Sequence, residues 1–550
     1  MKKLKPLGLG IDDFKKIIEE NYYYFDKTEM IEELLADGVE VTLFTRPRRF
    51  GKTLNMSMLK YFFNIEEREN NRKLFDNLYI SRSDFMNRQG ENPVIFISFK
   101  NIKYSSWDEC YSEIKNLIKE LYLKFYYIRE KISIFSRKEF DNILNEKSES
   151  SWTNSLRLLS GYLTEYYGKK AIILIDEYDT PIIYAYENNY YEKSVSFFKI
   201  FYGSALKGNE YLDRAVMTGI LRIVKEGIFS DLNNLIVYTV LDKKYSSYFG
   251  LTEEEIIQGL EEYGLINSLK DVRKWYNGYK FGKIDVYNPW SIINYLNNKE
   301  LRAYWVNTSN DNTINRLIKN ANLSMFEDLK KIFEGKSVNK VVNVFSNMSK
   351  MSSPQEIWHL MLFSGYLTVK DKLEMNQFSL RIPNYEVQTF FKDSFVEYNF
   401  DDNSNFIAMI DALINKDMET YEYYLKQIML LYLSYYGSSK INEKPYHNLI
   451  LGSILYLDGR YIINSNIERG FGRTDLTLTP KDRSKAGYIF EFKVVDSQED
   501  MQKGLDRALD QIKSKKYDEN MKNEGINEII HIGMVFCGKF VDMKWETVQN

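Results

Sequence analysis

Over roughly the first 300 residues, short runs of apolar residues alternate with longer segments in which apolar residues recur at helical spacing. The short runs lack polar alternation and are rich in β-branched and aromatic residues, which favours strands that are buried on both faces. Strands that alternate with helices predict a parallel α/β sheet. The predicted strands are residues 41–45, 93–99, 171–176 and 214–220.

After residue 300 the buried runs stop, and they return only in the last part of the chain. The intervening pattern favours a small helical or winged-helix module followed by a helical connector, and the tail again alternates strands with a helix. The chain is therefore expected to have four parts, which are residues 1–300, 301–400, 401–435 and 436–550.

Composition excludes several classes of protein. With 44% hydrophobic and 27% charged residues, the chain is typical of a soluble globular protein. Its net charge of −3 means that any nucleic-acid binding must depend on local basic patches. The two cysteines lie far apart, which fits a reduced, cytoplasmic setting. No signal peptide and no apolar run of about 18 residues is found, so no membrane partner is expected.

A candidate phosphate-binding loop follows the first buried run, in the stretch TRPRRFGKTLNM. In such loops, backbone N–H groups at a helix N-terminus bind an anion, a lysine reaches the terminal phosphates and a hydroxyl ligates Mg²⁺. Lys52 and Thr53 occupy those positions, but Arg46 stands where the motif has its first glycine. A surface loop with an incidental GKT tripeptide is the alternative.

Acidic residues at the end of another buried run favour the nucleotide site. Asp176 ends a strand expected to neighbour that of the loop, where it would hold the hydration shell of Mg²⁺, and Glu177 would polarise the attacking water. Thr218 ends a third strand, at the place of a γ-phosphate sensor. Arg222 follows it, and a structural role fits that residue equally well.

These residues resemble the AAA-ATPase-like family of bacterial proteins, in which RPRRFGK[ST] replaces the glycine-led loop. The resemblance covers roughly residues 5–300 and includes LIDEYDTPI and MTGILRIVKEGIFSDLNNL. It implies a P-loop NTPase sheet, ATP and Mg²⁺ as ligands, and ATP hydrolysis with Lys52, Thr53, Asp176 and Glu177 in the roles above. Whether Arg46 and Arg48 contact the nucleotide is left open. The other expected nucleotide contacts are Arg49, Phe50, Gly51, Leu54 and Thr218.

A second constellation lies in the tail, where the strand GYIFEFKVV carries Glu491 and Lys493 two residues apart and therefore on one face. Asp475, in the preceding strand pattern, is expected beside Glu491. Two carboxylates can hold Mg²⁺, and a nearby lysine can orient a water nucleophile. A structural salt bridge between Glu491 and Lys493, or a solvated edge strand, is the alternative.

The order of helix, hairpin with Asp, E-x-K strand and helix resembles the PD-(D/E)XK nuclease superfamily. The resemblance implies a restriction-endonuclease-like α/β domain in which Asp475 and Glu491 are metal ligands and Lys493 assists the nucleophile. Thr474 stands where the family motif has proline. Secondary candidates are Glu443, Glu468 and Gln511.

Histidine-based chemistry is not expected. His359, His447 and His531 are dispersed and have no zinc-binding spacing, so each is more readily explained as structural. No nucleophile elbow of the form G-x-S-x-G occurs either.

The sequence therefore predicts an ATP- and Mg²⁺-dependent nuclease that acts on nucleic acid, on DNA rather than RNA. The alternative is a nucleotide-dependent switch or scaffold whose nuclease-like domain binds nucleic acid without cleaving it. A third hypothesis is a structural ATP-binding protein without a nucleic-acid partner. Whether the chain forms a homo-oligomer is left open.

Overall fold

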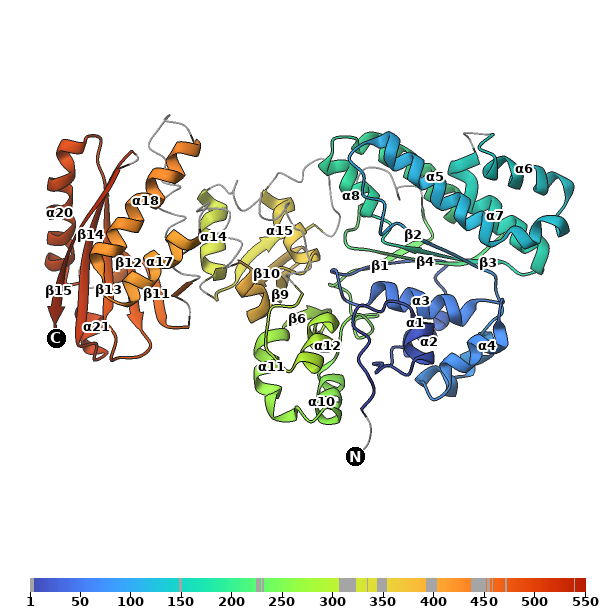
Figure 1. Cartoon of the computed structure of the whole chain (residues 1–550), viewed down its shortest axis with the longest axis horizontal. Coiled ribbons are helices and arrows are strands. Elements are labelled where there is room, and N and C mark those ends of the chain that lie inside the picture. The colour runs from blue at the N-terminus through green and yellow to red at the C-terminus, as the bar shows by residue number, and fades with distance from the viewer. Residues whose placement is uncertain are drawn as a thin grey trace. The chain divides into compact units, whose positions relative to one another are not determined.

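The computed structural model describes residues 4–147, 151–223, 229, 232–305, 323–333, 335–343, 354–391, 403–436, 452, 456–457, 459–469, 472–538 and 540–550. The chain forms two compact units (Figure 1). Unit 1 comprises residues 1–309 and 339–386, and unit 2 comprises residues 310–338 and 387–550. The sequence-based boundaries at 300, 400 and 435 remain predictions.

Unit 1 is built on a five-stranded sheet in the order β2-β3-β4-β1-β5, and every pair of neighbouring strands is parallel. Every residue of β1 and β3 is buried, which explains why their sequences are mainly apolar, apart from Thr42, Thr45 and Asp176. Strand β4 lies between β1 and β3, so the expectation that the acidic strand directly neighbours the loop strand is wrong. The strands are β1 Val41–Thr45, β2 Val94–Ser98, β3 Ala171–Asp176, β4 Leu212–Gly219 and β5 Leu235–Tyr238.

Helices cover both faces of this sheet, with α1 to α4 on one side and α5 to α7 on the other (Figure 1). This layering is the doubly covered α/β arrangement predicted from the alternating pattern. The helices are α1 Phe14–Glu19, α2 Glu29–Ala36, α3 Lys52–Phe63, α4 Arg68–Arg72, α5 Trp107–Lys124, α6 Ile134–Leu144, α7 Ser151–Tyr167, α8 Thr180–Glu187 and α9 Tyr191–Leu206.

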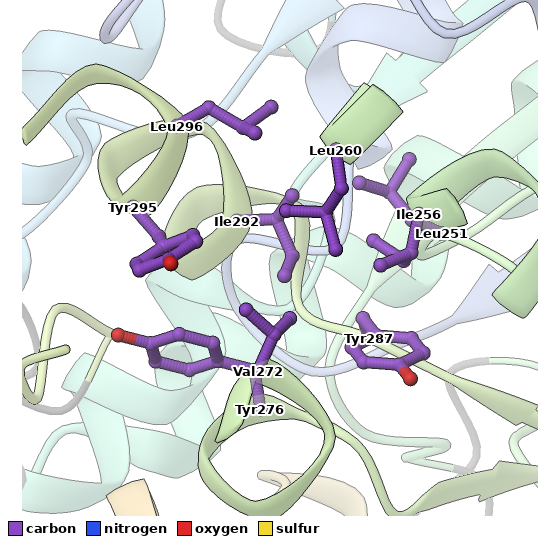
Figure 2. Close-up of a cluster of buried hydrophobic side chains, with 9 residues drawn as sticks. All are labelled: Leu251, Ile256, Leu260, Val272, Tyr276, Tyr287, Ile292, Tyr295 and Leu296. Atoms are coloured by element: carbon purple, nitrogen blue, oxygen red, sulfur yellow. The ribbon is translucent and has the colours of Figure 1, made fainter. Parts of the chain in front are cut away.

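A second apolar core in unit 1 joins three helices that follow the sheet. In Figure 2, Val272 and Tyr276 point toward Ile292 and Tyr295. The N-terminus of α10 is fixed by a capping box between Thr252 and Glu255. These elements are α10 Glu253–Glu262, α11 Leu269–Tyr276, α12 Pro289–Asn298 and the hairpin of β6 Tyr279–Phe281 and β7 Ile284–Val286.

Residues 339–386 belong to the same compact unit as residues 1–309. At Gly278, which has φ 111°, an added Cβ would lie 2.1 Å from the carbonyl oxygen of Pro383, so only glycine permits this approach. The module contains α15 Pro354–Phe363 and a sheet in the order β8-β10-β9, formed by β8 Val338–Val341, β9 Thr368–Glu374 and β10 Gln377–Arg381.

Unit 2 contains a mixed five-stranded sheet in the order β11-β12-β13-β14-β15. Strands β13 and β14 are parallel and the other neighbouring pairs are antiparallel. The strands are β11 Tyr461–Arg469, β12 Gly472–Pro480, β13 Gly487–Val494, β14 Glu528–Cys537 and β15 Phe540–Gln549.

Helix α20 Met501–Ser514 connects the parallel strands of unit 2 and packs on one face of the sheet, where Leu509 and Ile512 contact Ile489. On the other face, the ring centroid of Tyr421 lies 6.5 Å from that of Phe490. The sheet is therefore covered on both sides. The other α-helices among the described residues of unit 2 are α14 Leu323–Phe333, α17 Asn403–Ile414, α18 Met418–Tyr436 and α21 Glu519–Asn523. In the described part of the chain, no helix has both the length and the apolar composition that crossing a bilayer requires.

Candidate functional site

The candidate phosphate loop connects the end of β1 to the start of α3. Gly51 precedes the first residue of α3 and adopts a left-handed conformation with φ 81°. An added Cβ on Gly51 would meet nothing within 4 Å, so the backbone there is open to a ligand. The first amide groups of α3 have no acceptor within the helix, and together with the helix dipole they favour an anion at this end.

Lys52 lies at the centre of this loop and is 4% exposed. Its Nζ donates hydrogen bonds to the carbonyl oxygens of Arg46 at 3.0 Å and Pro47 at 2.9 Å. Burial lowers the pKa of Lys52, and the charge of Glu177 acts in the opposite direction. The ammonium is thus held among loop carbonyls, beside the N-terminus of α3.

Asp176, at the end of β3, accepts hydrogen bonds from α3 and from the ends of β2 and β4. Its Oδ2 accepts hydrogen bonds from Thr53 Oγ1 at 3.0 Å and from Ser98 Oγ at 3.3 Å, and its Oδ1 accepts one from Thr218 Oγ1 at 2.5 Å. The side chain of Asp176 is fully buried, and burial raises its pKa. The carboxylate of Asp176 and the hydroxyl oxygen of Thr53 already lie close together and could both ligate Mg²⁺ or its water shell.

Glu177 follows Asp176 in a left-handed conformation with φ 52°. Its amide donates to Thr218 Oγ1 at 3.3 Å, and its Oε2 accepts a hydrogen bond from Thr180 Oγ1 at 3.2 Å. The side chain is only partly buried, so water can reach it. This placement suits a residue that accepts a proton from water.

Arg46 occupies the position of the missing glycine, and its side chain has no exposed surface. Its guanidinium donates to the carbonyl oxygens of Thr45 at 2.9 Å and Tyr238 at 2.8 Å, and it lies 5.0 Å and 5.4 Å from the ring centroids of Phe249 and Phe281. Burial lowers the pKa of Arg46 to about 9. Arg46 therefore anchors the loop to β5 and is turned away from solvent.

The next residues of the loop are clamped by tryptophans. The guanidinium of Arg49 lies 4.3 Å from the ring centroid of Trp290, and the indole N–H of Trp305 donates to the carbonyl oxygen of Arg48 at 3.0 Å. Both tryptophans lie far along the chain, so this clamp depends on the packing of unit 1.

Phe50 packs against Tyr279 and Phe281, with ring centroids 5.0 Å and 5.2 Å away, and is fully buried. Any contact of Phe50 with a nucleotide must therefore come from its backbone. Leu54 and Arg222 are half-buried, and their parts in binding remain predictions.

The second candidate site lies on β12 and β13 of unit 2. Leu476 pairs with Phe490 in the antiparallel ladder, and continuing this register by one residue sets Asp475 opposite Glu491. Directly opposed residues have their Cβ atoms about 5 Å apart. The Oδ2 of Asp475 also accepts a hydrogen bond from the amide of Phe492 at 2.8 Å. The structure thus brings the two predicted carboxylates together.

Lys493 and Gln511 complete this group. The Nζ of Lys493 donates to Glu491 Oε1 and to Gln511 Oε1, each at 2.8 Å. The Gln511 amide in turn donates to Glu491 Oε1 and, at 3.3 Å, to the hydroxyl of Tyr517. Gln511, a secondary candidate in the sequence, lies on α20 and so joins the site.

One carboxylate oxygen of Glu491 has no hydrogen-bond donor among the described residues. Glu491 is 2% exposed, and its Oε2 is a buried atom without a hydrogen-bond partner in the described structure. Burial raises the pKa of Glu491 to about 7, although the hydrogen bond from Lys493 acts in the opposite direction. Burial also raises the pKa of Asp475. A buried carboxylate oxygen without a donor is the kind of atom that a divalent cation would satisfy.

Among the described residues, no group of three or more His, Cys, Asp or Glu side chains is arranged to hold a metal ion. Asp475 and Glu491 alone would hold a cation that completes its shell with water or substrate oxygens, as Mg²⁺ commonly does. Glu443 and His447 lie outside the described residues, as does the side chain of Glu468.

The two histidines that the structure describes, His359 and His531, are buried. His359 has its Nδ1 2.5 Å from the carbonyl oxygen of Asn343, and burial lowers its pKa to about 4. His531 lies 3.3 Å from Glu546 and 3.5 Å from Asp518. These contacts fit structural roles.

Sequence reasoning missed two residues at the first site, Ser98 and Asp179. Ser98 ends β2 and donates to Asp176, a role that only its position at a strand end could have indicated. Asp179 is 1% exposed and accepts hydrogen bonds from two amides in the segment after β4. It lies in the stretch DEYD, so its closeness in sequence to Asp176 and Glu177 was the signal that could have indicated it.

Comparison with known proteins finds two different family models, which match the parts of the chain that carry the two candidate sites. Residues 8–229 match the family model described as a predicted AAA-ATPase, and residues 441–546 match that of the PD-(D/E)XK nuclease superfamily. An uncharacterized protein from the vnfD 5′ region of Azotobacter chroococcum mcd 1 is 25% identical over 555 residues, covering 96% of this chain and 95% of its own. The chain thus carries an AAA-ATPase-like domain at residues 8–229 and a domain of the PD-(D/E)XK nuclease superfamily at residues 441–546.

Proposed function

We propose that the AAA-ATPase-like domain binds ATP with Mg²⁺ and hydrolyses it. The observation that carries this proposal is the 3.0 Å hydrogen bond between Thr53 and Asp176 at the N-terminus of α3. The same two oxygens would hold Mg²⁺ or its water shell, while the amides of the loop and Lys52 bind the β- and γ-phosphates.

In the proposed reaction, the oxygen of a water molecule attacks the γ-phosphorus and the bond to the β-phosphate oxygen breaks, which yields ADP and phosphate. Glu177 orients that water and accepts its proton, and Thr218 marks the position of the γ-phosphate. Bound Mg²⁺ would neutralise charge on the phosphate oxygens. Lys52 adds positive charge that the buried site does not screen.

The variant Lys52→Ala tests this proposal when ATP hydrolysis is measured with Mg²⁺. We expect a loss of at least about 100-fold, because a positioned charge in a buried site is removed. Lys60→Ala is the matched control, since Lys60 lies in the same helix over the rings of Tyr61 and Phe96. A Lys52→Ala variant as active as the wild type would refute the loop assignment.

We propose that the C-terminal domain is a metal-dependent nuclease that acts on nucleic acid, on DNA rather than RNA. The observation that carries this proposal is the buried Oε2 of Glu491, which lacks a donor although Asp475 and Lys493 lie beside it. An unpaired buried carboxylate oxygen is costly in a purely structural salt bridge. Asp475 and Glu491 would hold Mg²⁺, which supplies a Lewis acid for the phosphoryl oxygen.

Lys493 is placed to orient the attacking water, because its Nζ is held between Glu491 and Gln511. The water oxygen attacks the phosphorus of a phosphodiester, one phosphorus–oxygen bond breaks, and a phosphate end and a free hydroxyl result. The hydrogen bond from Gln511 to the hydroxyl of Tyr517 keeps Gln511, the partner of Lys493, in position.

Cleavage of plasmid, linear and single-stranded DNA and of RNA, with Mg²⁺ or Mn²⁺ and with or without ATP, tests the nuclease. We expect Glu491→Gln to lose cleavage and Asp482→Asn to retain it, because Asp482 is an exposed carboxylate in the turn between β12 and β13. If no substrate is cut but nucleic acid still binds, the switch or scaffold function replaces this proposal.

A reduced, cytoplasmic setting belongs to the same proposal and is supported by the two free cysteines, Cys110 and Cys537. Assembly into a homo-oligomer would be detected by measuring molecular mass in solution with and without ATP. A mass that increases with ATP would indicate that nucleotide binding promotes assembly.

A further inference from the structure

Two residues that follow Glu177 bind the segment after β4 tightly, although the proposed reaction does not use them directly. Tyr178 and Asp179 are fully or almost fully buried, at 0% and 1% exposure. Both contact residues 218–223, which comprise the last two residues of β4 and the four residues that follow it.

Asp179 holds the backbone of this segment through one carboxylate oxygen. Its Oδ2 accepts hydrogen bonds from the amides of Ile220 and Leu221, each at 2.8 Å. Its Oδ1 is a buried atom without a partner in the described structure and lies against Gly219, where an added Cβ would be 2.8 Å away. The charge of Lys52 acts on this carboxylate.

Tyr178 joins the same two segments at three points. Its amide donates to the carbonyl oxygen of Thr218 at 2.9 Å. Its hydroxyl donates to the carbonyl oxygen of Leu221 at 2.7 Å and accepts from the amide of Ile223 at 3.2 Å. Its ring lies so close to Gly219 that a Cβ added there would be 2.6 Å from the ring, so only glycine fits at this position.

Thr218, whose carbonyl oxygen accepts the hydrogen bond from the amide of Tyr178, also carries the hydroxyl that would face the γ-phosphate. Thr218 Oγ1 donates to Asp176 and accepts from the amide of Glu177, so a shift of this segment would move the Thr218 hydroxyl relative to Asp176 and Glu177. A displacement of about 1 Å in such groups can cost a factor of about 100 in rate.

We propose that Tyr178 and Asp179 are positioning residues for ATP hydrolysis, which hold the segment after β4 so that Thr218 and Glu177 keep their places beside Asp176. This inference rests on the proposed ATPase function. The carboxylate of Asp179 is buried and has two amide donors on one oxygen but none on the other. Burying such a group costs free energy, which favours a functional role over packing alone.

The variants Tyr178→Phe and Asp179→Asn test the inference in the full chain. Each keeps the size of the side chain and removes the hydroxyl or the charge. Tyr122→Phe is the matched control, because Tyr122 is also fully buried and its hydroxyl donates to the carbonyl oxygen of Ser155 at 2.8 Å, on the helices α5 and α7. Three quantities are measured: kcat for ATP hydrolysis with Mg²⁺, the Kd of ATP by calorimetry, and the Tm.

We expect kcat to fall about tenfold or more in the two site variants while the Kd of ATP changes less than about threefold, since the interactions act mainly in the transition state. Tyr122→Phe lowers the Tm but keeps kcat. Should Asp179→Asn fail to fold, Tyr178→Phe alone decides the outcome.

Unchanged kcat in the folded site variants, or an equal loss in Tyr122→Phe, would overturn the inference while the ATPase proposal stands. A wild-type chain that hydrolyses no ATP would instead contradict the ATPase proposal, and the inference with it. The wild-type measurement therefore separates the two failures.

Discussion

Gly51 illustrates how one residue shapes the phosphate loop. Its φ of 81° lies in the left-handed region, and the space around an added Cβ is empty, so a side chain would be opposed by backbone strain alone. We expect Gly51→Ala to cost about 1–2 kcal/mol of strain, which a shift of the loop would relieve at the cost of up to about tenfold weaker ATP binding. Calorimetric titration with ATP measures the effect.

Gly168 offers the control for this substitution. It has φ 67°, also has nothing within 4 Å of an added Cβ, and follows the last residue of α7. Gly168→Ala should lower stability similarly but leave the Kd of ATP unchanged. Equal loss of ATP affinity in both variants would show that the effect does not arise in the loop.

Arg46 is expected to matter for stability more than for charge at the site. Lysine cannot donate to both carbonyl oxygens and also stack on Phe249 and Phe281, so Arg46→Lys should lower the free energy of unfolding by about 2–3 kcal/mol. Urea unfolding measures this change. Arg82→Lys, at an exposed position, should stay within about 0.5 kcal/mol of the wild type. A stable Arg46→Lys variant would contradict the anchoring role.

At the scale of elements, Glu386 connects three segments of unit 1. The buried carboxylate accepts hydrogen bonds from the amides of Tyr304 and Trp305, each at 2.6 Å, and from Ser291 Oγ of α12 at 2.8 Å. Trp305 also holds the phosphate loop, so Glu386 supports the clamp on Arg48. It is the last residue of unit 1 before the chain enters unit 2.

Burial raises the pKa of Glu386 from 4.5 to about 7. The folded chain therefore keeps a proton that the unfolded chain loses, and the free energy of unfolding falls as the pH rises from about 4.5 to about 7. Glutamine can accept both amide hydrogen bonds and donate to Ser291. Glu386→Gln should thus be more stable than the wild type at pH 8, by up to about 3 kcal/mol, and differ little at pH 4.5.

Urea unfolding at both pH values checks this prediction. Glu300→Gln is the control, because Glu300 is exposed and its removal should leave the pH dependence of stability unchanged. A Glu386→Gln variant that is less stable than the wild type at pH 8 would show that the carboxylate is stabilised in its ionised form.

At the scale of the whole molecule, the two compact units are expected to respond to different ligands. ATP at 100 times its Kd should stabilise unit 1 by about 2.7 kcal/mol, since only the folded loop binds it. Six of the seven tryptophans lie in unit 1, at positions 107, 152, 275, 290, 305 and 358, so fluorescence during urea unfolding reports mainly on that unit.

Amide hydrogen exchange followed by mass spectrometry locates the protection. We expect ATP to slow exchange in β1, α3 and β3 and to leave β12 to β14 unchanged, and we expect Lys52→Ala to abolish the effect. Equal protection of both units by ATP would contradict this prediction and would indicate coupling between the two sites.

The strands of the first sheet could be predicted from sequence wherever burial on both faces makes a strand mainly apolar. Strands β1 to β3 and the second half of β4 are mainly apolar because both of their faces are covered, whereas Asp213 and Arg214 in the first half of β4 are only partly buried. The short edge strand β5, whose residues are all partly or fully exposed, carries no such signal and was missed. The insertion of β4 between β1 and β3 was missed too, because apolar runs do not encode strand order.

The chemistry of the candidate sites was determined largely by sequence, since the loop around Lys52 and the spacing of Glu491 and Lys493 follow from covalent order. Only the tertiary structure decided that Arg46 is a buried anchor, that Gln511 joins Glu491, and that Tyr178 and Asp179 hold the segment after β4. The physical reason is that charge and hydrogen-bonding groups are present in any conformation, whereas their burial and partners depend on residues that are distant in the chain.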